Sequence, residues 1–565
     1  MIKNDVLNHL AISDKRLVRS KDGSFTISID DVFLHSKYSP VKEARRLVED
    51  IISLDPAKTF VIVLGAGLGY HIEELEKAGF HNILVIERNI GAFEIFSKIF
   101  DCSQIPFIVS PDKPVEFIDS VFSNLKIENF KDIKTIMLRG GYLSDIYSPL
   151  EERIKRIVKV KLGDFTTRLK FEEVWFINIL ANIKNLQNSY TVKSLIDGNR
   201  TSGCPVLVIS AGPSLKFSIE TIRSISDYAV TIAVDTAVMP LFEAGIIPDF
   251  VFSLDSQPHN IPDFSMIDRD YLSRITLVYD TVVNPKLPFY FPGRKIISNT
   301  SHLDFDYKGN PFVMKSGLVE WIEHTGNFTI GDIETGGSVA TSAFHLAYLL
   351  GGDPVILIGQ DLAYSYKVSH SPSTPHFYRV LGMVDRLVTI ESLFLSVLLS
   401  RRAFPTKGID GEIYTDFVLD NFRGWFDESA RSIAKIDNKE KLINASLNGA
   451  EISNFKSVSH SELINTLSKR SKIDKSKLFL GLKLIDSLNV DKLIYNLKNL
   501  GCFVDNLGVV PSVFDKIEKS EFGFLNRYFM KEQMVFERYA SFDELNFKRK
   551  VRRLLKNIFG VIDGD

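Results

Sequence analysis

Polar residues and glycines stand directly after three apolar runs in the middle of the chain. Gly212-Pro213-Ser214, Asp235 and Asp255 each follow a run that we expect to be a buried strand, at 206–210, 229–234 and 250–254. Ligands of parallel α/β sheets bind outside the carboxyl ends of the strands, so these residues are expected to converge on one crevice. Glycine allows a sharp turn, proline suits the first helical turn, and Ser214 can cap a helix while donating to a phosphate. The pattern predicts an anion-binding site.

Two further segments extend this predicted site. Thr335-Gly336-Gly337-Ser338 precedes an apolar run at 338–350 that we expect to be a helix. Its hydroxyls and free backbone N–H groups suit a nucleotide phosphate or a sugar carboxylate. Gly359-Gln360-Asp361 ends a buried strand predicted at 355–358. Because all these features are expected at the same end of one sheet, the hypothesis is an active site there.

Two histidines follow Asp361 in a polar segment, His370 and His376. A loop behind a strand end is a suitable place for a catalytic base, and histidine titrates near neutral pH. The other interpretation is that these are merely exposed loop histidines. His345 lies inside the helix predicted at 338–350, where packing or capping is the expected role. His370 is therefore the first candidate for the base.

A second glycine-rich turn lies near the N-terminus, with Gly65, Gly67 and Gly69 between a predicted strand and helix. Such glycines permit close approach of the backbone to a ligand, and Glu87, at the end of the next strand, stands where a ribose hydroxyl would be held. The spacing is closer to S-adenosylmethionine methyltransferases than to dinucleotide dehydrogenases, because Tyr70 occupies the sixth position. A Rossmann-like sheet also needs glycine at this turn, and we favour that structural interpretation. The expected elements are strands at 59–64 and 83–87 and a helix at 71–78.

The composition limits the class of protein. With 565 residues, 45% hydrophobic and 24% charged, the chain is expected to form several globular domains. A formal net charge of −2 provides no general attraction for nucleic acid or anionic lipid. Three widely separated cysteines, Cys102, Cys204 and Cys502, exclude a disulfide framework and a cysteine-rich zinc site. We find no cluster of ligands at metal-binding spacing, and no metal site is predicted.

We expect a soluble cytoplasmic protein without stable membrane insertion. The N-terminus has no apolar segment typical of a signal peptide, and the longest apolar run, 338–350, is too short to span a bilayer. A basic amphipathic helix is predicted at 545–559. We expect its apolar face to pack on its own protein, although contact with a partner or membrane surface is the alternative.

The predicted fold class is α/β, with two tandem Rossmann-like parallel-sheet units followed by a helical C-terminal domain. The expected domains are residues 1–175, 176–430 and 431–565. In the first of them, residues 1–50 are expected to form short strands, including a hairpin at Asp22-Gly23, ahead of the Rossmann-like unit. A long helical stretch at 150–195 is expected to bridge two domains.

Several sequence blocks together resemble the Maf family (motility accessory factor, flagellin glycosyltransferases). The blocks are SAGPSLKFSIETIRSI, IAVDTAVMPLFEAGIIPDFVFSLD, TGGSVATSAFHLAYLLGGDPVILIGQDLAYS, GEIYTDFVLDNFRGWFDE and INASLNGAEI. SPVKEARRLVEDI and the Gly65 unit resemble the family's N-terminal domain, so the resemblance spans nearly the whole chain. The central blocks also resemble the MptE-like module of archaeal 6-hydroxymethylpterin pyrophosphokinases.

The resemblance implies transfer of a nonulosonic acid, of the pseudaminic or legionaminic type, from a CMP-activated donor to Ser or Thr of flagellin, in support of flagellar assembly and motility. The implied reaction is inverting. A base removes the acceptor proton while CMP departs from an anomeric carbon with oxocarbenium-like character. Because CMP is a good leaving group, no cofactor is obligatory, and Mg²⁺ is optional. The implied partners are flagellin and a nucleotide sugar, without nucleic acid.

The sequence departs from a related enzyme class at two positions, and two other functions stay open. The centre also resembles bacterial CMP-sialic acid sialyltransferases, which carry asparagine before Gly-Pro-Ser and at the second strand end, where this chain has Ala211 and Asp235. Base and ribose contacts are therefore not transferred from them. The alternative function is a Mg-ATP-dependent pyrophosphokinase acting on a pterin-like alcohol, with Asp235 and Asp255 holding Mg²⁺. The chain has no P-loop, and its large flanking domains suit a protein acceptor better. A non-catalytic scaffold is the third reading.

Overall fold

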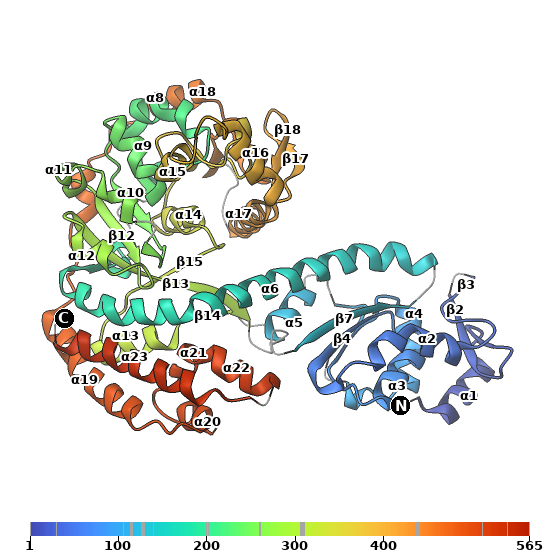
Figure 1. The fold of residues 1–565 in the computed structure, drawn as a ribbon. Helices are drawn as coiled ribbons and strands as arrows, with labels where there is room; N and C mark the ends of the chain where they lie inside the picture. The colour runs from blue at the N-terminus through green and yellow to red at the C-terminus, as the bar shows by residue number, and fades with distance from the viewer. Residues whose placement is uncertain are drawn as a thin grey trace. The chain divides into compact units, whose positions relative to one another are not determined.

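The computed structural model describes residues 2–563 except 30, 106, 114–116, 126–129, 139–140, 199–200, 202, 259–260, 306–310, 437–440, 511 and 540. The chain divides into two compact units (Figure 1). Unit 1 comprises Met1–Glu172, Asp304–Phe312 and Met530–Phe542, and unit 2 comprises Glu173–Leu303, Val313–Phe529 and Asp543–Asp565. The predicted boundary after residue 175 lies inside helix α6 (Gly141–Asn182). The predicted boundary after residue 430 lies inside α17 (Phe417–Ile436).

Unit 1 begins with a small antiparallel sheet between two helices. The hairpin predicted at Asp22-Gly23 is present, because β1 and β2 pair on either side of it. The expectation of strands alone up to residue 50 is wrong, since two helices form there. In the second, Ala44, Val48 and Ile51 are buried and recur at helical spacing, which is the pattern of a helix that packs one apolar face. The elements are α1 (Asn4–Ser13), β1 (Leu17–Arg19), β2 (Phe25–Ile29), β3 (Val32–Phe33) and α2 (Pro40–Ile52).

A parallel sheet in the order β6-β5-β4-β7 follows, which confirms the first Rossmann-like unit. Its two central strands are apolar and buried along their whole length, as expected for strands covered on both faces. The strands are β4 (Thr59–Leu64), β5 (Ile83–Ile86), β6 (Phe107–Val109) and β7 (Asp132–Met137), and the helices are α3 (Tyr70–Lys77), α4 (Ile90–Ile99) and α5 (Phe117–Asn124).

Unit 2 is built on a larger sheet in the order β14-β13-β12-β11-β10-β9-β16-β19-β20, and the pairings from β13 to β20 are all parallel. The second Rossmann-like unit is therefore also confirmed. The strands are β9 (Val206–Ile209), β10 (Val230–Val234), β11 (Phe250–Ser253), β12 (Thr276–Asp280), β13 (Arg294–Phe305), β14 (Pro311–Met314), β16 (Val355–Ile358), β19 (Leu442–Asn444) and β20 (Lys456–Ser457). Two short strands, β8 (Tyr190–Thr191) and β15 (Asp332–Glu334), pair with β13.

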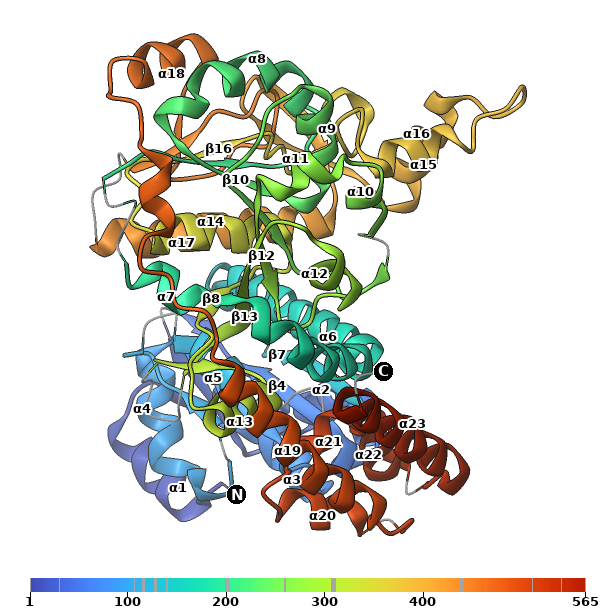
Figure 2. The same ribbon diagram turned by 90° about the vertical axis from the view of Figure 1, so that its left-hand side faces the viewer.

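The strand order of unit 2 reverses at β9. The chain builds outward from β9 to β13 and later returns to place β16 on the other side of β9, with Ile358 paired to Ile209. Such a reversal is where ligands of open α/β sheets bind. Figure 2 shows α8 (Leu215–Ile225) and α18 (His460–Leu467) on one side of β10 and β16, and α14 (Val339–Leu349) and α17 on the other.

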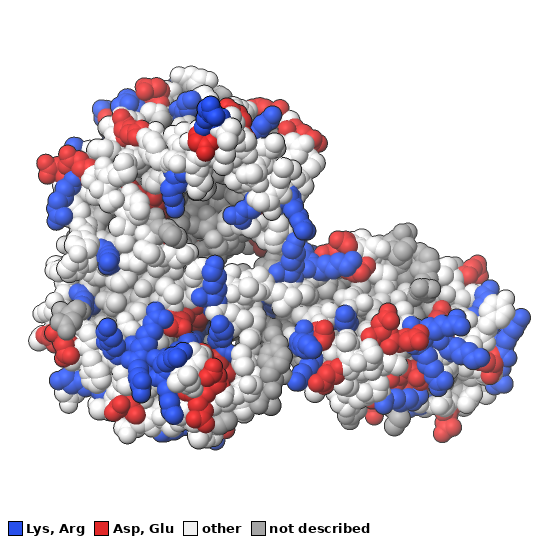
Figure 3. All heavy atoms as spheres, in the orientation of Figure 1, with Lys and Arg blue, Asp and Glu red and all other residues white. Residues whose placement is uncertain are grey.

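Helices form the C-terminal part of unit 2, as predicted. The helix expected at 545–559 is α23 (Glu544–Asp563), which packs on α19 (Ser487–Asp505). Phe547, Leu554 and Ile558 are buried, so the expected packing of its apolar face on its own protein is confirmed. Lys and Arg gather on the surface of these helices (Figure 3). Among the described residues, no helix combines the length and the apolar composition needed to cross a bilayer.

Candidate active site

The turns after β9 and β16 lie against each other at the strand reversal. The Gly212 amide donates to the Gly359 carbonyl at 2.8 Å. A side chain at Gly212 would not fit, because a Cβ there would stand 2.5 Å from the Gly359 oxygen and 2.9 Å from Cγ of Asp361. Two segments that the sequence predicts separately are thus brought together, and the close approach requires the glycine.

Asp361 occupies the N-terminus of α8. Its Oδ2 accepts the Ser214 amide at 2.8 Å, and its Oδ1 accepts the Ser214 hydroxyl. Burial raises the pKa of Asp361 to about 6, although the hydrogen bonds from Ser214 lower it. The expectation that Ser214 donates to a ligand phosphate is wrong. The chain's own carboxylate accepts both donors, so Asp361 positions the turn.

Three carboxylates lie near the ends of β10 and β11. Asp235 is buried and accepts the Ser253 hydroxyl at 2.8 Å, and burial raises its pKa to about 6. Asp255 accepts the Gln257 amide at 2.9 Å. The third, Asp263 on α10 (Ile261–Ser265), was missed because nothing local in the sequence marks it.

Asp263 has the most perturbed of these carboxyl groups. It is 4% exposed, and its Oδ1 has no hydrogen-bond partner among the described residues. Burial, with the negative charges of Asp235 and Asp255, raises its pKa to about 7, although Arg379 opposes the shift. A carboxyl group that titrates near neutral pH is suited to proton transfer.

The rings of the two predicted histidines contact each other beside the Gly212 turn, with their planes tilted by 43°. The ring centroids of His370 and His376 lie 4.4 Å apart, and the Ser371 amide donates to the Ala211 carbonyl at 2.9 Å. His376 and Arg379 belong to α15 (Pro375–Leu381). Burial, His376 and Arg379 together lower the pKa of His370 to about 3. His370 is therefore neutral at pH 7.

Buried polar atoms without partners gather around the strand reversal. Within the described part of the chain, no group hydrogen-bonds Oγ of Ser210, Oε1 of Gln360 or Oγ of Ser371. Ser210 follows β9, Gln360 follows β16, and Ser371 contacts the turn between β9 and α8. Each unmet group of this kind costs about 1–3 kcal/mol unless a ligand or water satisfies it. These three atoms make the strand reversal the candidate site for a polar ligand.

The predicted turn Thr335–Ser338 lies at the start of α14 and at the same edge of the sheet, since β15 runs parallel to β13. Its amides are not all free, contrary to expectation. Gly336 donates to the Thr341 hydroxyl at 2.8 Å, and Gly337 donates to that of Thr335 at 3.1 Å. The turn packs against Trp425 of α17, which a Cβ at Gly336 would meet at 2.8 Å or less.

His345 has the structural role that the sequence predicts. Its Nδ1 accepts the Glu334 amide at 2.9 Å, so the ring fixes the end of β15 against α14. Burial lowers its pKa to about 4.

A segment after β19 also supports the site. The Ser446 hydroxyl accepts the Gln360 amide at 2.8 Å, and the Ala450 amide donates to the Asp361 carbonyl at 2.7 Å. A Cβ at Gly449 would stand 2.8 Å from that same oxygen. These residues lie in INASLNGAEI, one of the blocks on which the family resemblance rests. No candidate residue was predicted there, because their contacts are with residues far away in the sequence.

The chain's own side chains fill the Gly65 turn in unit 1. Glu87 Oε2 accepts the amides of Ala66 at 2.8 Å and Gly67 at 3.3 Å, and His35 Nε2 accepts that of Leu68 at 2.8 Å. A Cβ at Gly67 would stand 2.5 Å from the same histidine nitrogen. The amides and the carboxylate that would bind a nucleotide are engaged with one another. The structural interpretation of this turn is supported.

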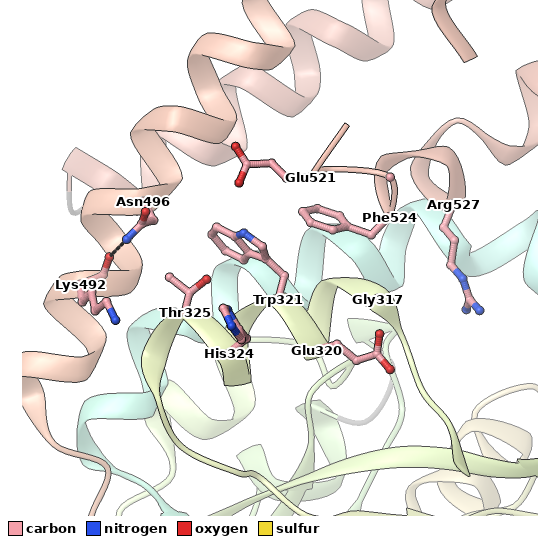
Figure 4. Close-up of a pocket in the computed structure, with 11 residues that line it drawn as sticks. Gly317, Glu320, Trp321, His324, Thr325, Lys492, Asn496, Glu521, Phe524 and Arg527 are labelled. Carbon is pink, nitrogen blue, oxygen red and sulfur yellow. Dashed lines mark hydrogen bonds between the residues drawn. The ribbon is translucent and has the colours of Figure 1, made fainter. Parts of the chain in front are cut away.

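The described surface of unit 2 is hollowed in more than one place. Its surface is hollowed on the face where α14 and α17 lie in Figure 1 (Figure 3). A separate cavity of about 780 Å³ lies between α13 (Gly317–Gly326), α19 and the turn at 521–527, with Trp321 and Phe524 among its lining residues (Figure 4). None of the strand-end residues lines this second cavity. Within the described residues, no three His, Cys, Asp or Glu side chains converge as metal ligands would.

Comparisons with known proteins agree with this geometry. Residues 177–367, which include the strand reversal, match the family model described as 6-hydroxymethylpterin diphosphokinase MptE-like. A solved Maf glycosyltransferase from Magnetospirillum magneticum AMB-1 has a similar structure, with a TM-score of 0.57 over 99% of this chain and 88% of the other, at 15% identity. The fold is that of a Maf glycosyltransferase. The resemblance to Maf proteins that the sequence predicts is thereby confirmed at the level of the fold.

Two proteins of Treponema pallidum (strain Nichols), both described as uncharacterized, are similar over parts of the sequence. One is 32% identical over 108 residues, and this chain spans half of its length. The other is 24% identical over 235 residues, or 39% of this chain and 76% of that protein. Neither description names an activity.

Proposed function

We propose that the protein is a glycosyltransferase that moves a sugar from a nucleotide donor to an acceptor hydroxyl. The observation that carries the proposal is the group of buried polar atoms without partners, on Ser210, Gln360 and Ser371, at the strand reversal. The likeness to a Maf glycosyltransferase supports this assignment of the site.

The proposed donor is a CMP-activated nonulosonic acid, which carries a phosphate and a carboxylate. Because Asp361 already occupies the N-terminus of α8, the donor's negative charges are assigned instead to Arg379, the cation beside His370. Asp235 and Asp263 can hold ribose or sugar hydroxyls, since Arg379 interacts with Asp263. The proposed acceptor is a Ser or Thr of flagellin in the cytoplasm, in support of motility.

His370 is the proposed base. It removes the acceptor proton, the acceptor oxygen attacks the anomeric carbon, and CMP leaves with the electrons of the broken C–O bond. The ring is neutral at pH 7 and can accept a proton, and a bound dianionic donor would raise its pKa from about 3. Asp263, whose pKa is about 7, is the second candidate. The pH dependence of the reaction separates the two.

A binding screen followed by a transfer assay tests the proposal. CMP alone is expected to raise the melting temperature of the full chain, whereas S-adenosylmethionine is not. CMP-activated pseudaminic or legionaminic acid together with flagellin should then release CMP and increase the flagellin mass by one sugar. A shift that requires ATP and Mg²⁺, with no shift from CMP, contradicts the proposal.

The description of the matching family model favours a second function, diphosphate transfer from ATP to a pterin-like alcohol. This reaction needs Mg²⁺, for which Asp235 and Asp255 are the protein ligands to test, with phosphate oxygens completing the coordination. AMP release from ATP in the presence of such an alcohol identifies this function. The loss of that activity in Asp255→Asn would assign it to the same site.

A further inference from the structure

Helix α16 (Ile390–Ser400) is apolar, and the described residues leave one of its faces exposed. Its sequence is IESLFLSVLLS, and none of its residues is buried. Leu395 is 55% exposed and Leu399 is 70% exposed. A helix of this composition is normally enclosed by protein, and a large exposed apolar patch marks an interaction site. Figure 2 places α15 and α16 at the outer margin of unit 2.

The exposed face of α16 alternates leucine with serine. Ser392, Ser396 and Ser400 recur every fourth residue beside Leu395 and Leu399. Each serine hydroxyl donates to the carbonyl three residues earlier, at 2.7–2.9 Å, so its polarity is satisfied within the helix. The face therefore consists of leucine ridges next to shallow grooves, which a second helix with the same pattern can fill.

Charges stand at the two ends of this face. Glu391 begins the helix, Arg401 and Arg402 follow its last residue, and all three are exposed. Between them α16 carries no charge. A helix that lies on a membrane surface typically has lysine or arginine along its polar face, and α16 has none there. Its charge pattern instead complements an antiparallel copy of itself.

We infer that α16 is the contact through which two copies of this chain form a dimer. In an antiparallel pair with its two-fold axis between Leu395 and Ser396, each Leu395 faces the other copy's Ser396. Leu399 faces Ser392 in the same register. Glu391 then lies within about one helical turn of the other copy's arginine pair. The contact is the same on both copies, as two-fold symmetry requires.

The surroundings of α16 can enlarge the contact to the usual size. A stable interface takes about 20–30 residues from each partner, more than one helix supplies. Large apolar side chains are also exposed on the neighbouring connection and the hairpin of β17 (Phe404–Gly408) and β18 (Gly411–Thr415). They are Met383, Val384, Leu387, Phe404 and Tyr414.

The dimer reaches the candidate active site through α15. The rings of Phe377 on α15 and Phe394 on α16 are stacked with centroids 6.2 Å apart, and α15 carries His376 and Arg379. A partner that immobilises α16 therefore restrains the helix that carries Arg379 and His376. This consequence rests on the proposed glycosyltransferase function, whereas the dimer itself does not.

Sedimentation velocity of the full chain, from nanomolar to high micromolar concentration, tests the dimer without an activity assay. We expect a concentration-dependent dimer, and at least about tenfold weaker association in Leu395→Arg and in Leu399→Arg. Leu488→Arg is the matched control, because this leucine of α19 is 72% exposed and lies outside α16. Far-UV circular dichroism should be unchanged in all three variants.

A charge exchange tests the antiparallel register. Glu391→Arg should weaken the dimer, and its combination with Arg401→Glu and Arg402→Glu should restore it. A chain that stays monomeric at every concentration overturns the proposal, as does a dimer that Leu395→Arg leaves intact. A monomeric chain that floats with phosphatidylglycerol vesicles also overturns the dimer proposal. If Leu395→Arg abolishes this flotation, α16 is a lipid-binding helix. If the dimer persists but CMP neither binds nor is released, only the function of the site is contradicted.

Discussion

The carboxylate of Asp361 accepts both the backbone amide and the hydroxyl of Ser214, 147 residues earlier in the chain. This pair ties the end of β16 to the start of α8, the two elements that flank the strand reversal. A carboxylate at a helix N-terminus satisfies donors that would otherwise attract a phosphate. The pair therefore leaves neither the amide nor the hydroxyl proton of Ser214 for a ligand phosphate.

Asp361→Asn is expected to destabilise unit 2 by about 1–3 kcal/mol, because the amide can accept only one of the two Ser214 donors. Urea unfolding followed by tryptophan fluorescence measures this loss. Asp353→Asn is the control. Its carboxylate lies 3.7 Å from Lys441 and is 43% exposed, so its removal should change stability by less than about 0.5 kcal/mol. Equal effects of the two substitutions would contradict the role given to Asp361.

Stability is expected to fall as pH rises from about 4 to about 6. Burial raises the pKa of Asp235, Asp280 and Asp361 to about 6 in the folded chain, above the value near 4 of an unfolded aspartate. Between these values the folded state binds more protons, so ionisation favours unfolding. The slope of unfolding free energy against pH should become shallower in Asp361→Asn. A slope equal to that of the unmodified chain contradicts the raised pKa.

His370→Ala is expected to abolish sugar transfer and to leave the CMP-induced melting shift in place, because the ring is assigned to the acceptor proton. CMP release in the presence of acceptor measures sugar transfer. A thermal melt with CMP measures binding. His324→Ala, an exposed position on α13, should retain full activity. Full activity of His370→Ala would remove this histidine from the mechanism.

Asp263→Asn is expected to alter the pH profile of transfer. If Asp263 acts only when ionised, kcat/KM falls as pH decreases through about 7, its pKa in the folded chain. The substitution should remove this acid limb from the activity that remains. An acid limb near pH 7 that persists in Asp263→Asn contradicts the assignment of this titration to Asp263.

Gly67→Ala is expected to destabilise unit 1 by about 1–3 kcal/mol. Its φ is +51°, and a Cβ there would stand 2.5 Å from His35 Nε2 and 2.7 Å from Leu138 Cδ2. Gly163→Ala is the matched control, because it lies in α6 with nothing within 4 Å of its Cβ position. Alanine there should be neutral or stabilising by up to about 1 kcal/mol. Destabilisation by both substitutions to the same extent would contradict the packing described for the Gly65 turn.

Buried strands and their turns could be read from the sequence. The strands predicted at 59–64 and 355–358 coincide with β4 and β16, and the helix predicted at 338–350 corresponds to α14 with Ser338 as its cap. These elements combine a short apolar run with glycine or proline at its end, which is local information. The helix α2 was missed although its signals are local. Pro40 stands at its first turn, and Ala44, Val48 and Ile51 recur at helical spacing.

The sequence by itself determined the α/β fold class and the strand-end positions of Gly212, Asp235 and Gln360, because apolar runs and turn residues act locally. Only the tertiary structure decided that Asp361 bonds Ser214, that Asp263 joins Asp235, and that the amides of the Gly65 turn are filled by Glu87 and His35. Hydrogen bonds and charge interactions between distant segments depend on which strands become neighbours. A local sequence pattern does not determine the neighbours of a strand. Burial, which raises or lowers the pKa of each candidate acid and base, also exists only once the chain has folded.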